Sequence, residues 1–231
     1  MKSIESAYIL HIRDYRESSA LLDVISEHEG RFSLIAKGVK SAKRKQKLHL
    51  QCFRKIAISW AGRSDLKTLT SAEELGLPLK LSENTLLAGF YLNELLTRLL
   101  QPFDPHPEIF NLYEHTLSAL TESSQMEQTL RLFEKNLLQA LGYGLQLTHD
   151  VTANDINREA SYCYLLESGP RLVVSDQSQG VIVSGKTLLA LHSECLDDPE
   201  SLKESKRLMR YLLSPYIGQR PLKTRELFNY Y

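Results

Sequence analysis

The spacing of apolar residues changes near residue 80, and this change constrains the fold more than any other feature of the sequence. Before that point, apolar and polar residues alternate in short runs with many β-branched residues. After it, apolar residues recur at intervals of three and four. A period of two is typical of β-strands and a period near 3.6 of α-helices. The chain is therefore expected to begin with a β-rich part and to continue as mostly helical.

Five short strands are predicted in the first part. The third shows the clearest alternation, and Gly30 before it can adopt the positive φ of a tight turn. Five short antiparallel strands are typical of a small barrel such as the OB-fold, although an SH3-like barrel would use similar strands. The predicted strands are Ala7–Ile12, Ala20–Ile25, Arg31–Lys37, Cys52–Ala61 and Leu66–Ala72.

The remainder is predicted to hold five helices with a small β-hairpin insertion, which makes the fold α+β. Ser82 and Asp198 are residue types that cap helix N-termini. We place the domain boundary at residue 79, with a barrel domain over 1–79 and a helical domain over 80–231. The helices are expected over 82–100, 107–120, 124–141, 185–195 and 199–213, with strands at 161–166, 171–175 and 181–183.

The composition is that of a folded protein, with 42% hydrophobic and 24% charged residues. The longest apolar runs are far shorter than the roughly 20 residues of a membrane helix. The N-terminus does not have the layout of a signal peptide. Cys52, Cys163 and Cys195 form no close pair, which fits free thiols in a reducing compartment. The sequence predicts a cytoplasmic protein with no membrane partner.

The net charge of zero hides an uneven distribution. Residues 1–80 hold 15 Lys and Arg against 9 Asp and Glu, whereas residues 81–231 hold 13 against 19. Between Gly30 and Ser64 there are ten basic residues and no acidic one. Such asymmetry points to a nucleic-acid or other acidic partner.

We interpret this acid-free segment as a nucleic-acid-binding surface, because clustered cations bind phosphate and release counterions. The alternative is a solvated loop without a ligand. Bases could stack on Tyr8, Tyr15, Phe32, Phe53 or Trp60. The candidate DNA-binding residues are Arg13, Arg31, Lys37, Lys40, Lys43, Arg44, Lys45, Lys47, Lys55 and Arg63.

The segment Gly180–Thr187 matches the P-loop pattern G-x-x-x-x-G-K-[ST]. Its interior is Val-Ile-Val, which favours a strand. Only 44 residues follow Thr187, too few to complete a doubly wound nucleotide domain. We interpret the segment as a strand, a glycine turn and a helix start, and keep nucleotide binding as an alternative.

No catalytic or metal site is expected. The chain has no Cys-x-x-Cys, G-x-S-x-G or H-E-x-x-H pattern, and its seven histidines are scattered. We therefore predict a protein that is not an enzyme and that needs no cofactor.

Seven short motifs, in order along the chain, resemble the bacterial recombination-repair family RecO. The resemblance implies an N-terminal OB-fold and a mostly helical C-terminal domain. Many members carry a four-cysteine zinc finger, but between Gly144 and Gly185 this chain has only Cys163. The region 144–185 is thus expected to be a loop and hairpin without zinc. The motifs lie at Ala7–Asp23, Gly30–Gly38, Lys67–Glu73, Tyr91–Leu96, Phe133–Glu134, Leu141–Gly144 and Pro221–Phe228.

The resemblance also implies a function and partners. Family members bind single- and double-stranded DNA, anneal complementary strands and, with RecR, help load RecA onto DNA coated by single-stranded-DNA-binding protein (SSB). RecF and RecA would be indirect partners, and the location would be the nucleoid. We expect Arg131 to bind the acidic, apolar-ended SSB tail. A third hypothesis is an adaptor whose barrel binds RNA.

Overall fold

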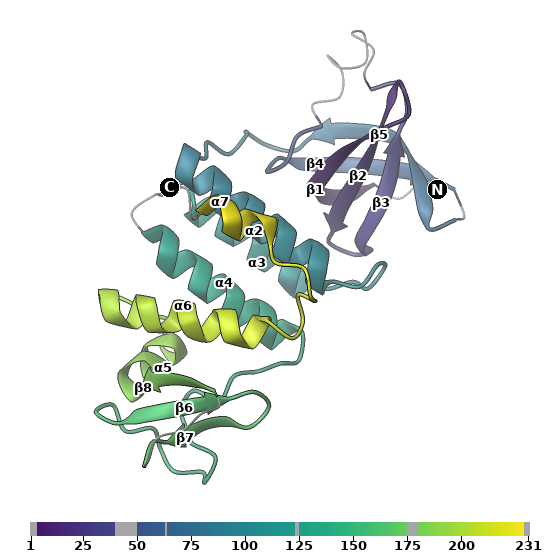
Figure 1. The fold of residues 1–231 in the computed structure, drawn as a ribbon. Coiled ribbons are helices and arrows are strands. Elements are labelled where there is room, and N and C mark those ends of the chain that lie inside the picture. The colour runs from purple at the N-terminus through teal and green to yellow at the C-terminus, as the bar shows by residue number, and fades with distance from the viewer. Residues whose placement is uncertain (1–3, 40–49, 63, 123–124, 175–179, 229–231) are drawn as a thin grey trace. The chain divides into compact units, whose positions relative to one another are not determined.

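The computed structural model describes residues 4–39, 50–62, 64–122, 125–174 and 180–228 of the chain. They form two compact units (Figure 1): unit 1 comprises residues 1–123 and 220–231, and unit 2 comprises residues 124–219. The predicted boundary at residue 79 follows the barrel, but it does not coincide with this division. No helix in the described ranges has the length and apolar character needed to cross a membrane.

Unit 1 begins with a closed barrel of five strands in the order β1-β2-β3-β5-β4 (Figure 1). Strand β1 pairs antiparallel with both β2 and β4, and β3 pairs parallel with β5. This is the topology of an OB-fold, so the predicted fold class is confirmed. The strands are β1 (Glu5–Tyr15), β2 (Ser19–Ser26), β3 (Gly30–Ala36), β4 (Lys55–Ala61) and β5 (Leu66–Glu74).

Alternation along the strands builds the barrel core. In β3, Phe32, Leu34 and Ala36 are buried while the residues between them are partly exposed. Strand β1 departs from this pattern, because Ala7–Leu10 are all buried. The side chain of Tyr8 faces helices: its ring lies 5.6 Å from Phe110 and 5.3 Å from Tyr113. Strand β1 is therefore covered on both faces in its first half.

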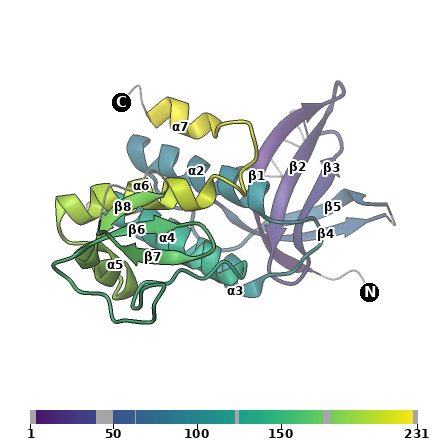
Figure 2. The same ribbon diagram turned by 60° about the horizontal axis from the view of Figure 1, so that its bottom comes forward.

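Within the described residues, unit 1 also contains three helices: α2 (Glu83–Leu99), α3 (Pro107–Ala119) and α7 (Lys223–Phe228). Ser82 caps α2 as predicted, accepting a hydrogen bond from Thr85 N–H. Inside the unit, the Asn93 amide donates to Leu10 O at 2.8 Å, which joins α2 to β1. Helix α7 was not predicted; both ribbon views place it alongside α2 (Figures 1 and 2).

The part of unit 2 that the structure describes combines three helices with a sheet in the order β7-β6-β8. The strand predicted at 171–175 was placed too late, because β7 already begins at Gly169. Pro170 is tolerated there since β7 is an edge strand. Asp198 caps α6 as predicted, accepting from Ser201 N–H. The elements are α4 (Met126–Ala140), β6 (Ser161–Leu165), β7 (Gly169–Leu172), β8 (Val181–Ser184), α5 (Gly185–His192) and α6 (Pro199–Leu213).

Candidate nucleic-acid interface

The outer face of β1, β2 and β3 is the barrel surface on which OB-folds bind nucleic acid. Cross-strand pairing places His11, Asp23 and Ser33 in one row of this face. In the next row, Arg13 pairs with Leu21, and Leu21 with Ile35. We call these six residues the barrel face. Its exposed polar groups come mainly from β1, because β2 lies in the middle of the three strands.

Asp23 organises the cations of the barrel face. Its carboxylate is buried and accepts hydrogen bonds from Arg13 Nη2 at 3.0 Å and from Ser33 Oγ at 2.6 Å. His11 Nδ1 lies 4.0 Å from the same carboxylate. Arg13 keeps 53% of its side chain exposed, so it can contact a phosphate while Asp23 holds its position.

Two other predicted cations contribute to the fold of unit 1. Arg31 Nε donates to Leu100 O at 3.0 Å, and Arg31 O accepts from Phe103 N–H, which joins β3 to the loop after α2. Lys55 Nζ lies 2.7 Å from the Glu114 carboxylate on α3. Burial alone would raise the pKa of Glu114, but hydrogen bonds from Lys55 and Tyr8 and the charge of Lys55 lower it. Both cations are therefore partly committed to internal contacts.

Lys37 differs from these residues. It follows the end of β3, is exposed, and has no ion-pair partner within the described part of the chain. The structure therefore leaves both Arg13, on β1, and Lys37, after β3, exposed to solvent. The remaining candidates lie outside the described residues, and their roles stay predictions: they are Lys40, Lys43, Arg44, Lys45, Lys47 and Arg63.

Most of the aromatic residues expected to stack on bases are core residues, so that expectation was wrong for them. Tyr8, Phe32 and Phe53 are buried. Trp60 packs against Phe32 with ring centroids 4.9 Å apart. Tyr15, at the end of β1, is partly exposed, and the guanidinium of Arg16 lies over its ring at 5.3 Å. Periodicity alone did not separate these cases, since an aromatic residue fits either side of a strand.

The P-loop-like segment is a strand followed by a helix, as we interpreted it. Val181–Ser184 pair with β6, and Ser184 caps α5. A Cβ added to Gly185 would lie 1.9 Å from Asn157 O, so this glycine permits close backbone packing. Lys186 Nζ lies 3.1 Å from Asp198. The segment therefore lacks the open loop that cradles a phosphate.

Arg131 is not at the surface of unit 2. The residue is 6% exposed, and its Nη2 donates to the buried Glu134 carboxylate at 2.6 Å. A peptide could not reach this guanidinium without a rearrangement of α4. That Arg131 binds the SSB tail stays a prediction, and the described geometry gives it a role inside the unit.

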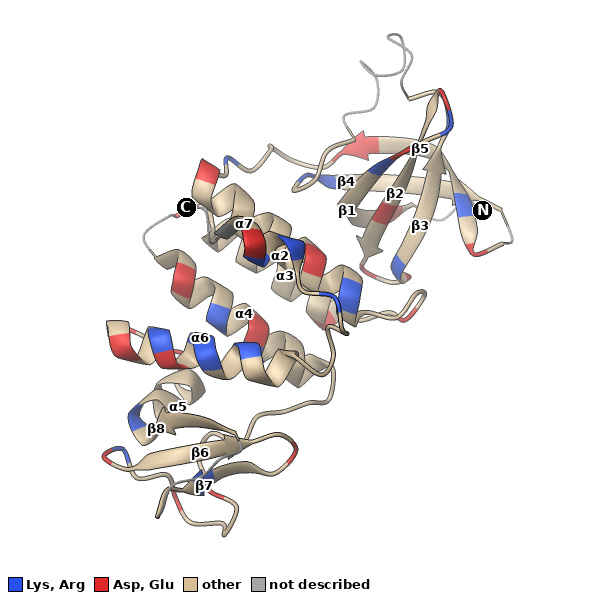
Figure 3. Ribbon diagram, viewed as in Figure 1, with Lys and Arg blue, Asp and Glu red and all other residues tan. Residues whose placement is uncertain are grey.

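Exposed cations of unit 2 lie instead on α6, and sequence reasoning missed them. Lys203, Arg207 and Arg210 are exposed, and their spacing places them on one side of the helix. Figure 3 shows several blue segments along α6. The Glu204 carboxylate, on the same helix, accepts from the Thr187 and Ser184 hydroxyls at 2.6 and 2.7 Å and lies 3.9 Å from Arg207 Nη2. The spacing i, i+4, i+7 was a readable signal, but the net negative charge of the second part concealed it. We call Lys203, Arg207 and Arg210 the α6 stripe.

The described residues contain no group of three or more His, Cys, Asp and Glu placed to hold a metal ion. The three cysteines are free thiols, as expected. The exposed cations Arg13, on the barrel face, and Lys37 suit the phosphate groups of a nucleic-acid backbone.

The barrel topology defines an OB-fold protein, and its accessible cations fit the class of nucleic-acid-binding barrels. Two family models match: "Recombination protein O N terminal" over residues 1–77 and "Recombination protein O C terminal" over residues 82–226. The chain belongs to the RecO family of DNA repair proteins.

Curated relatives agree with this assignment. A protein named DNA repair protein RecO from Nitrosococcus oceani is 46% identical over 225 residues, covering 97% of this chain and 92% of the relative. Proteins of the same name are 42% identical in Methylococcus capsulatus, with coverage of 97% and 92%, and 44% identical in Coxiella burnetii, with coverage of 97% of both chains. These names give a role in DNA repair; that the chain has no enzymatic activity stays a prediction.

Proposed function

We propose that this chain is a recombination mediator that binds single- and double-stranded DNA and anneals complementary strands without hydrolysing a nucleotide. It would act in the cytoplasm at the nucleoid, with RecR as partner, and help load RecA onto SSB-coated DNA. RecF would take part indirectly. Family membership and the OB barrel support this proposal. The observation that carries it is a pair of accessible cations: Arg13 on β1, and Lys37, which belongs to the acid-free segment.

The chemistry of annealing fits such a surface. Two strands repel each other through their phosphates, and cations that bind both backbones offset this repulsion. Contacts to phosphate leave the base edges free to pair. On the barrel face, Asp23 holds Arg13 at β1, while Lys37 continues into the segment that holds Lys40–Lys47. Weak, sequence-independent binding follows from this arrangement.

The test is binding of fluorescent DNA to the full chain across a range of salt. We expect affinity to fall by about two to three orders of magnitude between roughly 50 and 200 mM salt, with little sequence preference. Arg13→Ala with Lys37→Ala should weaken binding, whereas Arg158→Ala with Arg171→Ala, which removes the same charge from unit 2, should not. Affinity independent of salt would contradict the proposal. If unlabelled RNA displaces the fluorescent DNA more strongly than unlabelled DNA does, the RNA-adaptor alternative is favoured.

A second surface is proposed for the acidic SSB tail, and the α6 stripe favours it over Arg131. Lys203 and Arg210 are exposed, and helix α6 packs against α4 in unit 2. Carboxylates of an acidic peptide can reach these cations from solvent. Arg131, by contrast, has its charge compensated by Glu134 inside the unit.

The tail proposal is tested by titrating the labelled tail peptide into the full chain. Lys203→Ala with Arg210→Ala should weaken peptide binding and leave naked-DNA binding unchanged. The matched control is again Arg158→Ala with Arg171→Ala. Arg131→Ala is a poor first variant, because it breaks the buried ion pair with Glu134, and removing one partner of a buried pair costs about 3–5 kcal/mol of stability. Equal weakening by both double variants would contradict a specific site on α6.

A further inference from the structure

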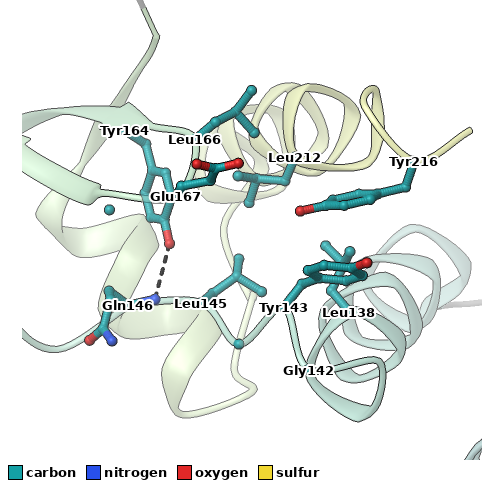
Figure 4. A pocket seen from close by; sticks show the side chains of 12 residues that line it. Leu138, Gly142, Tyr143, Leu145, Gln146, Tyr164, Leu166, Glu167, Leu212 and Tyr216 are labelled. Atoms are coloured by element: carbon teal, nitrogen blue, oxygen red, sulfur yellow. Dashed lines mark hydrogen bonds between the residues drawn. The ribbon is translucent and has the colours of Figure 1, made fainter. Parts of the chain in front are cut away.

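Unit 2 contains a half-open cavity of about 230 Å³ that none of the functions above uses. It lies where the end of α4, the turn between β6 and β7, and the end of α6 meet (Figure 4). Part of its wall is apolar, formed by Leu138, Leu145, Leu166 and Leu212. The volume is below the 300–1,000 Å³ typical of small-molecule pockets. A single side chain of a partner is therefore a better match than a cofactor.

The polar side chains that line this cavity are three tyrosines, Gln146 and one carboxylate. Tyr143 and Tyr216 stack with ring centroids 4.0 Å apart and an interplanar angle of 29°. Glu167 is the charged residue among the lining residues, which include no Lys, Arg or His. Burial raises the pKa of Tyr216, and the nearby Tyr143 and Glu167 raise it further. Because the Glu167 carboxylate is not balanced by a cation among these lining residues, the cavity would repel an acidic tail.

The backbone fixes the position of Glu167. Its φ is 62°, a left-handed conformation that is uncommon for residues other than glycine. The turn is tight, since Ser168 N–H donates to Leu166 O at 2.7 Å. Figure 4 shows the carboxylate of Glu167 directed into the space between Tyr164 and Leu212. Backbone strain of this kind is often retained where a side chain must be aimed at a ligand.

We propose that the cavity binds an arginine side chain of a protein partner. The leucines would cover its aliphatic stem, and the Glu167 carboxylate would pair with its guanidinium. A planar guanidinium also stacks on tyrosine rings, which the compact ammonium of lysine does less well. The stacked pair of Tyr143 and Tyr216 supplies such a ring surface at the rim. This site is independent of DNA binding by the barrel, so either proposal can fail alone.

The test is an NMR titration of the full chain, with tyrosine rings labelled and the Tyr143 and Tyr216 signals assigned from phenylalanine variants. The probe is Nα-acetyl-arginine methylamide. The corresponding citrulline compound is the matched control, because it has nearly the same shape without the charge. We expect the arginine probe to shift both signals and to bind about fivefold to tenfold more tightly than citrulline.

Glu167→Gln should remove this preference for arginine, while Glu159→Gln, which deletes an exposed carboxylate outside the cavity, should leave it intact. Both positions are exposed, so neither variant is expected to unfold the chain. Equal binding of arginine and citrulline, equal effects of the two variants, or unmoved Tyr143 and Tyr216 signals would each overturn the proposal. DNA binding by Glu167→Gln should equal that of the unmodified chain.

Discussion

Gly30 shows how a single residue fixes the barrel against its helices in unit 1. It has a φ of 71°, and a Cβ at this position would lie 2.2 Å from Asp104 O in the loop after α2. The neighbouring Arg31 binds the same loop through Leu100 O. The turn between β2 and β3 therefore needs both a left-handed residue and the absence of a side chain.

Gly30→Ala is expected to lower the free energy of unfolding by about 3 kcal/mol or more, since the clash is with backbone. The matched control is Gly76→Ala, where φ is +82° and nothing lies within 4 Å. Gly76→Ala should lower the free energy of unfolding by about 1 kcal/mol, because alanine is less stable than glycine in a left-handed conformation. Denaturant unfolding of both variants measures the difference. Equal losses of unfolding free energy in the two variants would show that the close approach of Gly30 to Asp104 O does not contribute to stability.

At the scale of elements, α7 is held by a residue far away in sequence. The Glu94 carboxylate on α2 accepts from Lys223 N–H and Thr224 N–H, each at 3.0 Å, and from the Thr224 hydroxyl at 2.8 Å. Burial alone would raise the pKa of Glu94, but these hydrogen bonds and the charge of Arg98 lower it. A six-residue helix is too short to be stable alone, so this contact decides whether α7 forms.

Glu94→Ala should release α7 while α2 and the barrel remain folded. Hydrogen exchange of residues 222–228 should become faster, and Glu83→Ala on the exposed first turn of α2 should leave it unchanged. Acid should have the same effect on the unmodified chain. Because the pKa of Glu94 is lowered by folding, its contribution is full above the usual value near 4.5 and is lost as pH falls through the folded value. Slow exchange in Glu94→Ala would contradict this role.

The features that the sequence could not predict depend on tertiary packing, which leaves no local pattern in the sequence. The alternation in β3 and the caps Ser82 and Asp198 are local signals, and the structure confirms them. Helix α7 depends on Glu94, about half the chain away, so no local pattern indicates it. Arg131 follows a similar logic in the candidate site, since only packing shows that its charge is buried beside Glu134.

At the scale of the whole molecule, two groups of cations are proposed to bind two different ligands. Cations of the barrel and the acid-free segment are proposed to bind DNA backbones, and the α6 stripe to bind an acidic peptide. Each unit has its own accessible cations, although the second part of the chain is net negative. Total charge therefore predicts DNA affinity less well than the position of exposed cations does.

The most direct test of the proposed function is the annealing rate of complementary oligonucleotides, naked and SSB-coated, with the full chain and no ATP. One variant removes Lys43, Arg44, Lys45 and Lys47 from the acid-free segment; the other removes Arg158, Arg171, Lys203 and Arg210 from unit 2. We expect the first to slow annealing of naked strands by about tenfold or more. The second should spare naked strands and slow only SSB-coated ones. Equal losses on naked strands, or no annealing without ATP by the unmodified chain, would contradict the account.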